Sequence, residues 1–201
     1  MRSSVSKLLL LGAALYAGLV FGACKNDSSR PTPPKRAAIL DNPPDPVRDP
    51  LVNKLLDKLY VGTLGSSMDE ADLKNLPTEF PNRPKLIEPF QKLSNSDWQI
   101  KFDAFQYRLV ELADVRRMDS DSLFRCIRSL HDKHEGTTAL LPVAAVRTSL
   151  HRQGAWLIVC VWEIAESHGK AGDAKNLPLS HYWVYLMRAD DQQILAQSSC
   201  D

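Results

Sequence analysis

Residues 155–164 constrain the fold of this chain more than any other segment. Their side chains are apolar on both sides of a period of two, with Trp156, Ile158, Cys160 and Trp162 on one side and Leu157, Val159 and Val161 on the other. A strand that is apolar on both sides is normally buried on both, because neither face is suited to water. The segment therefore predicts a strand over 155–165 at the centre of a sheet that other elements cover.

Three further segments have the same strand-like composition. Residues 143–150, 179–188 and 194–200 are rich in β-branched and aromatic side chains. Turn-like pieces at 152–154 (RQG) and 189–191 (ADD) separate two pairs of these runs. Together with 155–165, they predict a four-stranded antiparallel meander that occupies the C-terminal part of the chain.

Helical spacing dominates before that meander. Leucines at 51, 55, 56 and 59 share one helical face, which predicts a short helix that stops near Gly62. The apolar residues of 98–117 predict a helix of about four turns. The alternation of Trp98, Ile100, Phe102 and Ala104 keeps a strand as the alternative there.

Another helix is predicted after residues 119–121 (DSD), because these side chains can cap a helix start. Its buried face consists of Leu123, Cys126, Ile127 and Leu130, and it ends before Gly136. The fold class is thus α+β, with N-terminal helices packed on the C-terminal four-stranded antiparallel meander in two layers. This order is similar to that of the cystatin-like and nuclear-transport-factor-like folds, an analogy of architecture that does not fix function.

The first 23 residues have the pattern of a signal peptide. Arg2 and Lys7 precede the uncharged run LLLLGAALYAGLV, which is shorter than the roughly 20 residues that a membrane-spanning helix needs. The run ends at Phe21-Gly22-Ala23-Cys24, which resembles the lipobox of bacterial lipoproteins. The resemblance implies that Cys24 becomes the first mature residue and carries a covalent lipid. It also implies that the protein is anchored to a membrane of the bacterial cell envelope, with its domain outside the cytoplasm.

The segment 24–50 contains 7 of the 13 prolines. Because proline fixes φ and lacks a donor, we expect a flexible tether that is partly polyproline II and forms no core. The remainder, 51–201, is expected to form a single α+β domain. The 25 basic residues barely exceed the 24 acidic ones, so nucleic acid is not an expected partner.

Two clusters are candidate sites. His131 and His134 lie three residues apart near a helix end, where two imidazoles can bind a metal, although a histidine there also interacts favourably with the helix dipole. His181, Trp183 and Tyr185 alternate along one strand face, and a hairpin with 155–165 would add Trp156 and Trp162. These rings are either a platform that binds a glycan or a peptide, or the core beneath the helices.

With Cys24 lipidated, three cysteines remain. In a meander, Cys160 and Cys200 would lie two strands apart, beyond the reach of a disulfide. Cys126 with Cys200 is therefore the expected pair if a disulfide forms, and three reduced thiols are the alternative.

No catalytic motif is recognised, since the chain lacks a G-x-S-x-G elbow and a glycine-rich phosphate loop. We therefore expect a membrane-anchored envelope lipoprotein that presents a small, non-catalytic binding or assembly domain, with an envelope protein or glycan as partner. The alternatives are a ligand-binding domain that uses the aromatic face, and a metal-dependent enzyme that uses His131 and His134. No cofactor is expected besides the lipid.

Overall fold

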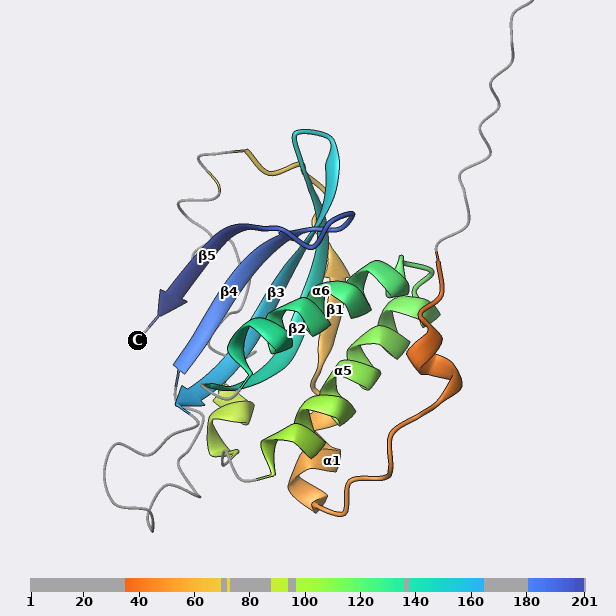
Figure 1. The fold of residues 1–201 in the computed structure, drawn as a ribbon, viewed down its shortest axis with the longest axis vertical. Coiled ribbons are helices and arrows are strands. Elements are labelled where there is room, and N and C mark those ends of the chain that lie inside the picture. Colours follow the sequence, from red (N-terminus) through yellow and green to blue (C-terminus); the bar gives the residue numbers. More distant parts are fainter. Residues whose placement is uncertain are drawn as a thin grey trace, which may run out of the picture. The chain divides into compact units, whose positions relative to one another are not determined.

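A computed structural model describes residues 35–69, 72, 88–93, 97–135, 138–164 and 181–200. Helices cover a mixed sheet with the strand order β1-β2-β3-β4-β5, so the α+β class is confirmed (Figure 1). The strands are β1 (Tyr60–Thr63), β2 (Thr138–Leu150), β3 (Gln153–Ile164), β4 (His181–Arg188) and β5 (Ile194–Cys200). The predicted signal peptide and the lipobox-like residues that end at Cys24 lie outside the described residues.

The prediction of a four-stranded antiparallel sheet is wrong in one strand. β1 is a fifth strand in the described part of the chain, and it runs parallel to β2 with Tyr60 opposite Ala144. It is parallel because the chain returns to the sheet only after two long helices, a crossover that permits this direction. Its four residues are too few to show alternation, and Gly62 within them reads as a helix stop.

β2 also starts earlier than residue 143. The register with β3 shifts between Pro142 and Ala144, which marks a β-bulge. Proline lacks the N–H that a regular ladder needs, and a bulge is one of the places where a strand tolerates it. Pro142 therefore lies inside the strand, one residue before the predicted start at 143.

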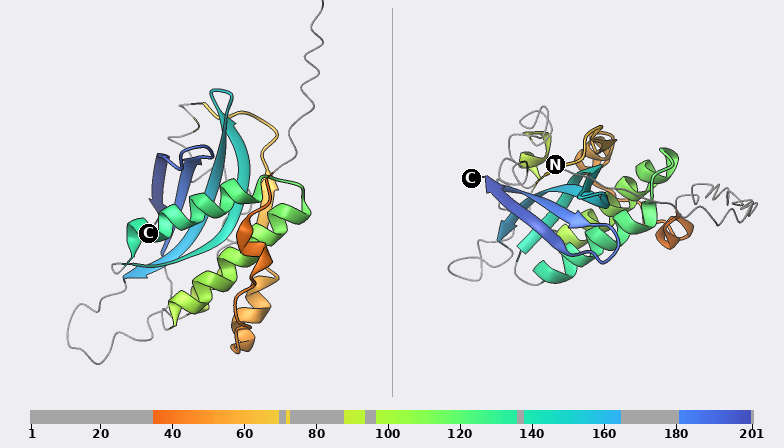
Figure 2. Two further views of the ribbon diagram at one scale, coloured as in Figure 1. Left: turned by 45° about the vertical axis from the view of Figure 1, so that its right-hand side comes forward. Right: turned by 90° about the horizontal axis from the view of Figure 1, so that it is seen from above.

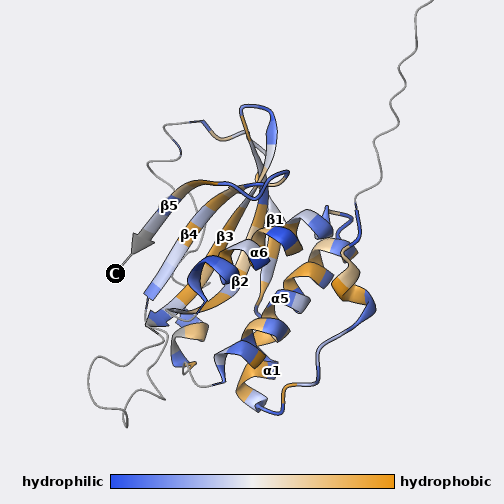
Figure 3. Cartoon of the chain, viewed as in Figure 1, coloured by the Kyte–Doolittle hydropathy of each residue, from blue (hydrophilic) through white to orange (hydrophobic). Residues whose placement is uncertain are grey.

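The prediction that residues 155–164 form a central strand is confirmed. β3 pairs antiparallel with β2 and with β4, so Ile158 lies between Ala145 and Tyr185. The side chains of 155–161 are at most 1% exposed. Figure 3 shows these apolar strands behind the hydrophilic outer face of a helix.

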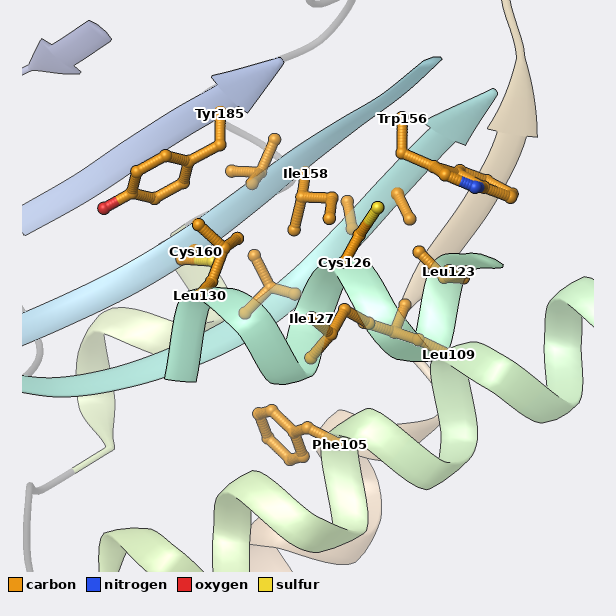
Figure 4. Packing of buried hydrophobic residues seen from close by; sticks show 14 of the residues in the cluster. Phe105, Leu109, Leu123, Cys126, Ile127, Leu130, Trp156, Ile158, Cys160 and Tyr185 are labelled. Atoms are coloured by element: carbon orange, nitrogen blue, oxygen red, sulfur yellow. The ribbon is translucent and has the colours of Figure 1, made fainter. Parts of the chain in front are cut away.

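The helix predicted over 98–117 is confirmed as α5 (Trp98–Val115), and the strand alternative is wrong. The next helix, α6 (Ser120–His134), begins as predicted: the Asp119 side chain accepts a hydrogen bond from the N–H of Ser122 at 3.0 Å. Both helices pack on one face of the sheet (Figure 2). Figure 4 shows Phe105 and Leu109 of α5 beneath Ile127 of α6, within the core.

Part of the segment expected to be a tether is packed on the domain instead. The N–H of Ala37 donates to Ser120 Oγ at 3.1 Å, and the N–H of Asp121 donates to the carbonyl of Lys35 at 3.2 Å. Ala37 and Leu40 are buried, the latter in a short 3-10 helix, η1 (Ala38–Asp41). The folded part of the chain thus begins before residue 51, because a proline-rich segment can still bury the apolar residues between its prolines.

From η1 the chain passes over the outer side of α5 to the helix α1 (Pro50–Leu56). Asp49 caps α1 by accepting from the N–H of Leu51 at 2.8 Å, and Pro50 occupies the first turn, where its missing N–H costs nothing. A second 3-10 helix, η2 (Glu88–Lys92), buries Phe90 against Phe105, with 5.8 Å between the ring centroids. In the part of the chain that the structure describes, no helix is long and apolar enough to cross a membrane.

Candidate functional site

An aromatic cluster lies where α6 ends over β3 and β4. The register places Trp162 opposite His181, and Trp183 two residues further along β4. All three side chains are on the sheet face toward α6, and the last residue of α6, His134, contacts Trp183. We call Trp162, His181, Trp183 and His134 the aromatic stack.

The four rings follow one another in the order His181, Trp162, Trp183, His134. The successive ring centroids are 4.8, 4.3 and 4.9 Å apart, and the indoles of Trp162 and Trp183 are stacked at an interplanar angle of 21°. His181 and Trp183 are separated by two residues, about 7 Å along a strand, which leaves room for one ring between them. Each indole therefore has a neighbouring ring on both of its faces.

All four members of the stack are half-buried. Because each indole has neighbouring rings on both sides, we infer that the part of each indole that solvent reaches is chiefly its edge. The indole Nε1 of Trp162 is buried without a hydrogen-bond partner in the described residues. The site is thus an aromatic corner of the described part of the chain whose four members are partly exposed.

Tyr185 packs against the aromatic stack from the side of the core. Its side chain is fully buried, and burial, with a smaller contribution from Cys160, raises the pKa of its hydroxyl. The hydroxyl therefore stays protonated and can donate to Nε2 of His134, 3.0 Å away. Burial, followed by the charge of Lys133, lowers the pKa of His134, which favours the neutral imidazole that can accept this bond.

Trp156, which the sequence groups with these rings, belongs to the core. It is fully buried, and its Nε1–H donates to Ser122 Oγ of α6 at 2.9 Å. The guanidinium of Arg147 lies over its ring, 5.2 Å from the centroid. The two interpretations of the aromatic residues are therefore each right for part of the set: Trp156 and Tyr185 are core, whereas Trp162, His181 and Trp183 reach the surface.

The two histidines proposed as metal ligands have different surroundings. His131 is 3% exposed, between Trp98 and Phe102, with its ring nitrogens 3.1 Å from Asp132 Oδ1 and 3.0 Å from Gln99 Oε1. His134 faces β4 instead. No group of three or more candidate metal ligands comes together among the described residues. The three-residue spacing placed both histidines on one helix but could not show that different elements pack against them.

The structure does not contain the expected disulfide. Cys126 and Cys160 are buried free thiols, and Sγ of Cys126 lies 3.6 Å from the carbonyl oxygen of Arg188. Cys200 pairs with Tyr182 at the other end of β4, six residues and about 20 Å away. The register of β5 on β4, which the sequence does not reveal, separates the two cysteines. Burial raises the pKa of Cys126 to about 12, so its thiol is inert near neutral pH.

Sequence reasoning missed one member of the stack. His134 was singled out only as a metal ligand, because nothing in the sequence shows that the end of α6 lies over β4. Comparison of the chain with protein-family models, with curated proteins and with solved structures finds no match.

Proposed function

We propose that this protein is a lipid-anchored, non-catalytic binding or assembly protein of the bacterial cell envelope, which contacts a partner protein through the edges of the aromatic stack. The anchor part of the proposal rests on residues 1–24, with Arg2 and Lys7 before an uncharged run and the lipobox-like end at Cys24. The binding part rests on the geometry of the stack.

The observation that carries the binding part is the half-buried edge of Trp162 and Trp183 at one corner of the domain. Tryptophan is enriched at the energetic centres of protein interfaces, because it buries a large area with few rotatable bonds. The stacking holds both side chains in place before a partner arrives, which reduces the entropy lost on binding.

The same geometry favours a protein partner over a glycan. A sugar ring stacks on an open indole face, and both faces of each indole already contact another ring. A glycan would have to displace His181 or His134 first. Edges and half-buried apolar side chains suit a peptide or protein surface better.

The anchor is tested by labelling cells with a palmitate analogue and comparing the native protein with a Cys24→Ser variant. We expect the native protein to carry the label and the variant to lose it. Label in neither protein, or in both, would contradict a lipid at Cys24.

The binding surface is tested by placing a photo-cross-linking amino acid at position 183 and, as a control, at Arg128 on the exposed side of α6. We expect a discrete cross-linked species in cells from position 183 and none from position 128. A Trp162→Ala substitution, which removes the ring beside residue 183, should abolish it. Equal cross-linking from both positions, or none from position 183, would contradict the proposal, and protection by added envelope glycans would favour the glycan alternative.

A further inference from the structure

A groove separate from the aromatic stack lies on the outer side of α5. An open cavity of about 620 Å³ lies between residues 44–49 and the N-terminal end of α5, where Asp97, Ile100 and Lys101 line it. A smaller hollow of about 230 Å³ continues along the helix past Ala104 and Tyr107, with residues 44–47 again forming one wall. The larger cavity is within the range of sites that bind small molecules or single side chains.

The wall opposite α5 is held in place without a ligand. Its prolines, Pro44 and Pro46, fix φ at their positions. The side-chain amide of Asn53 in α1 donates to the carbonyl of Val47 at 3.0 Å, and Asp49 caps the same helix. A groove whose walls are fixed in advance loses little entropy when it is filled.

The lining of the larger cavity is acidic. Four carboxylates, Asp45, Asp49, Asp97 and Asp103, stand against Arg48 and Lys101, which gives a net charge of −2. Lys101 is only 6% exposed, and its charge is compensated locally by Asp49 and Asp97, the two carboxylates that act on it electrostatically. Asp49 and Asp97 together still exceed the charge of Lys101 by one, and Asp45 and Asp103 exceed that of Arg48 by one. The resulting net charge of −2 favours a cation in the cavity.

The arrangement of the carboxylates indicates what kind of cation fits. No three of them come close enough together to hold a metal ion among the described residues, so their charge is spread over the cavity. The remaining lining is apolar, including the prolines and Ile100, which is 56% exposed. A long aliphatic side chain with a charged end matches this mixture, because its stem can cover apolar surface while its head meets carboxylates.

We propose that this groove binds a basic segment of a partner protein, with a lysine or arginine side chain in the larger cavity and the adjoining residues along the smaller hollow. The continuity of the two hollows along the helix favours an extended segment over a compact small molecule. None of the residues that line the groove belongs to the aromatic stack, so this proposal stands or falls independently of the proposed function.

The test uses the full chain and a fluorescein-labelled hexalysine peptide, with a hexaglutamate peptide for comparison, measured by fluorescence anisotropy. We expect hexalysine to bind and hexaglutamate not to bind. Asp45→Asn and Asp103→Asn should each weaken binding by about five- to tenfold, because each removes one charge from the cavity. Asp190→Asn, which removes the same charge from an exposed turn, should change the affinity less than about twofold.

A neutral variant separates the groove from general attraction to an acidic surface. Ile100→Trp keeps every charge and fills the cavity, and it should weaken hexalysine binding as much as the aspartate variants do. Trp183→Ala, in the aromatic stack, should leave that binding unchanged. No binding of hexalysine, an equal effect of Asp190→Asn, or full binding by Ile100→Trp would each overturn the proposal.

Discussion

The hydrogen bond between Trp156 and Ser122 provides a measurable test of where the structure places Trp156. Trp156→Phe removes the donor and part of a fully buried ring, and Ser122→Ala removes the acceptor. The lost hydrogen bond contributes about 1 kcal/mol. The smaller buried ring adds about 1 kcal/mol at about 25 cal/mol per Å² of apolar surface. Trp156→Phe should therefore lower the free energy of unfolding by about 2 kcal/mol.

Ser122→Ala leaves a buried indole N–H without a partner, which should cost about 1 to 3 kcal/mol. In the double variant that N–H is absent, so the two losses should not add. The sum of the single effects should exceed the double effect by about 1 kcal/mol, the coupling between the two groups. Urea unfolding of the purified protein, followed by circular dichroism, measures all four corners of this cycle.

A surface position for Trp156 would give a different result. An exposed tryptophan replaced by phenylalanine should change stability by no more than about 0.5 kcal/mol. A coupling near zero together with such a small effect would refute the placement of Trp156 beneath α6. A large single effect without coupling would retain the burial and refute the hydrogen bond.

Three further predictions follow from other parts of the core and its edge. A Cβ on Gly154 would stand 2.2 Å from Nη2 of Arg147, so Gly154→Ala should displace the guanidinium from the indole of Trp156. The free energy of unfolding, measured in urea, should fall by about 0.5 to 1 kcal/mol. Gly65→Ala, whose Cβ meets nothing within 4 Å, is the matched control, and equal losses would contradict the contact. Burial raises the pKa of Cys126 to about 12, so iodoacetamide at about pH 9 should modify this thiol in urea but not in the native protein. Peptide mass mapping measures the modification. A modified thiol in the native protein would contradict its burial. Because burial lowers the pKa of His134 in the fold, stability should be full above the unfolded pKa of about 6.5 and should decrease as the pH falls below it. This decrease should be smaller in His134→Gln, and an unchanged pH dependence would argue against a neutral imidazole held in the fold.

The sequence predicted those elements whose pattern is long enough to exclude alternatives. The two apolar sides of residues 155–164 could only be satisfied by a central, covered strand, and the capping residue Asp119 marked the start of α6. β1 could not be predicted, because its pairing with β2 depends on contacts between distant segments rather than on its own four residues.

The candidate site shows the same division. Alternation along β4 placed His181 and Trp183 on one face, and the register with β3 placed Trp162 opposite His181, where its ring contacts both of the others. Trp156 differs from these three residues because α6 covers its end of β3, whereas the end with Trp162 is partly exposed. A strand pattern reports the face of a side chain but not which element covers each part of that face.

Because residues 35–49 are packed on the domain, they determine where a lipid anchor at Cys24 would be joined to it. A chain lipidated at Cys24 has only eleven residues to Lys35, a reach of no more than about 40 Å when fully extended. It enters the domain at the beginning of α6, where Lys35 accepts from Asp121, whereas the aromatic stack lies at the other end of this helix, about 20 Å away. A lipid at Cys24 would therefore attach the domain near the start of α6, and the rings would lie at the end of this helix farther from the attachment point.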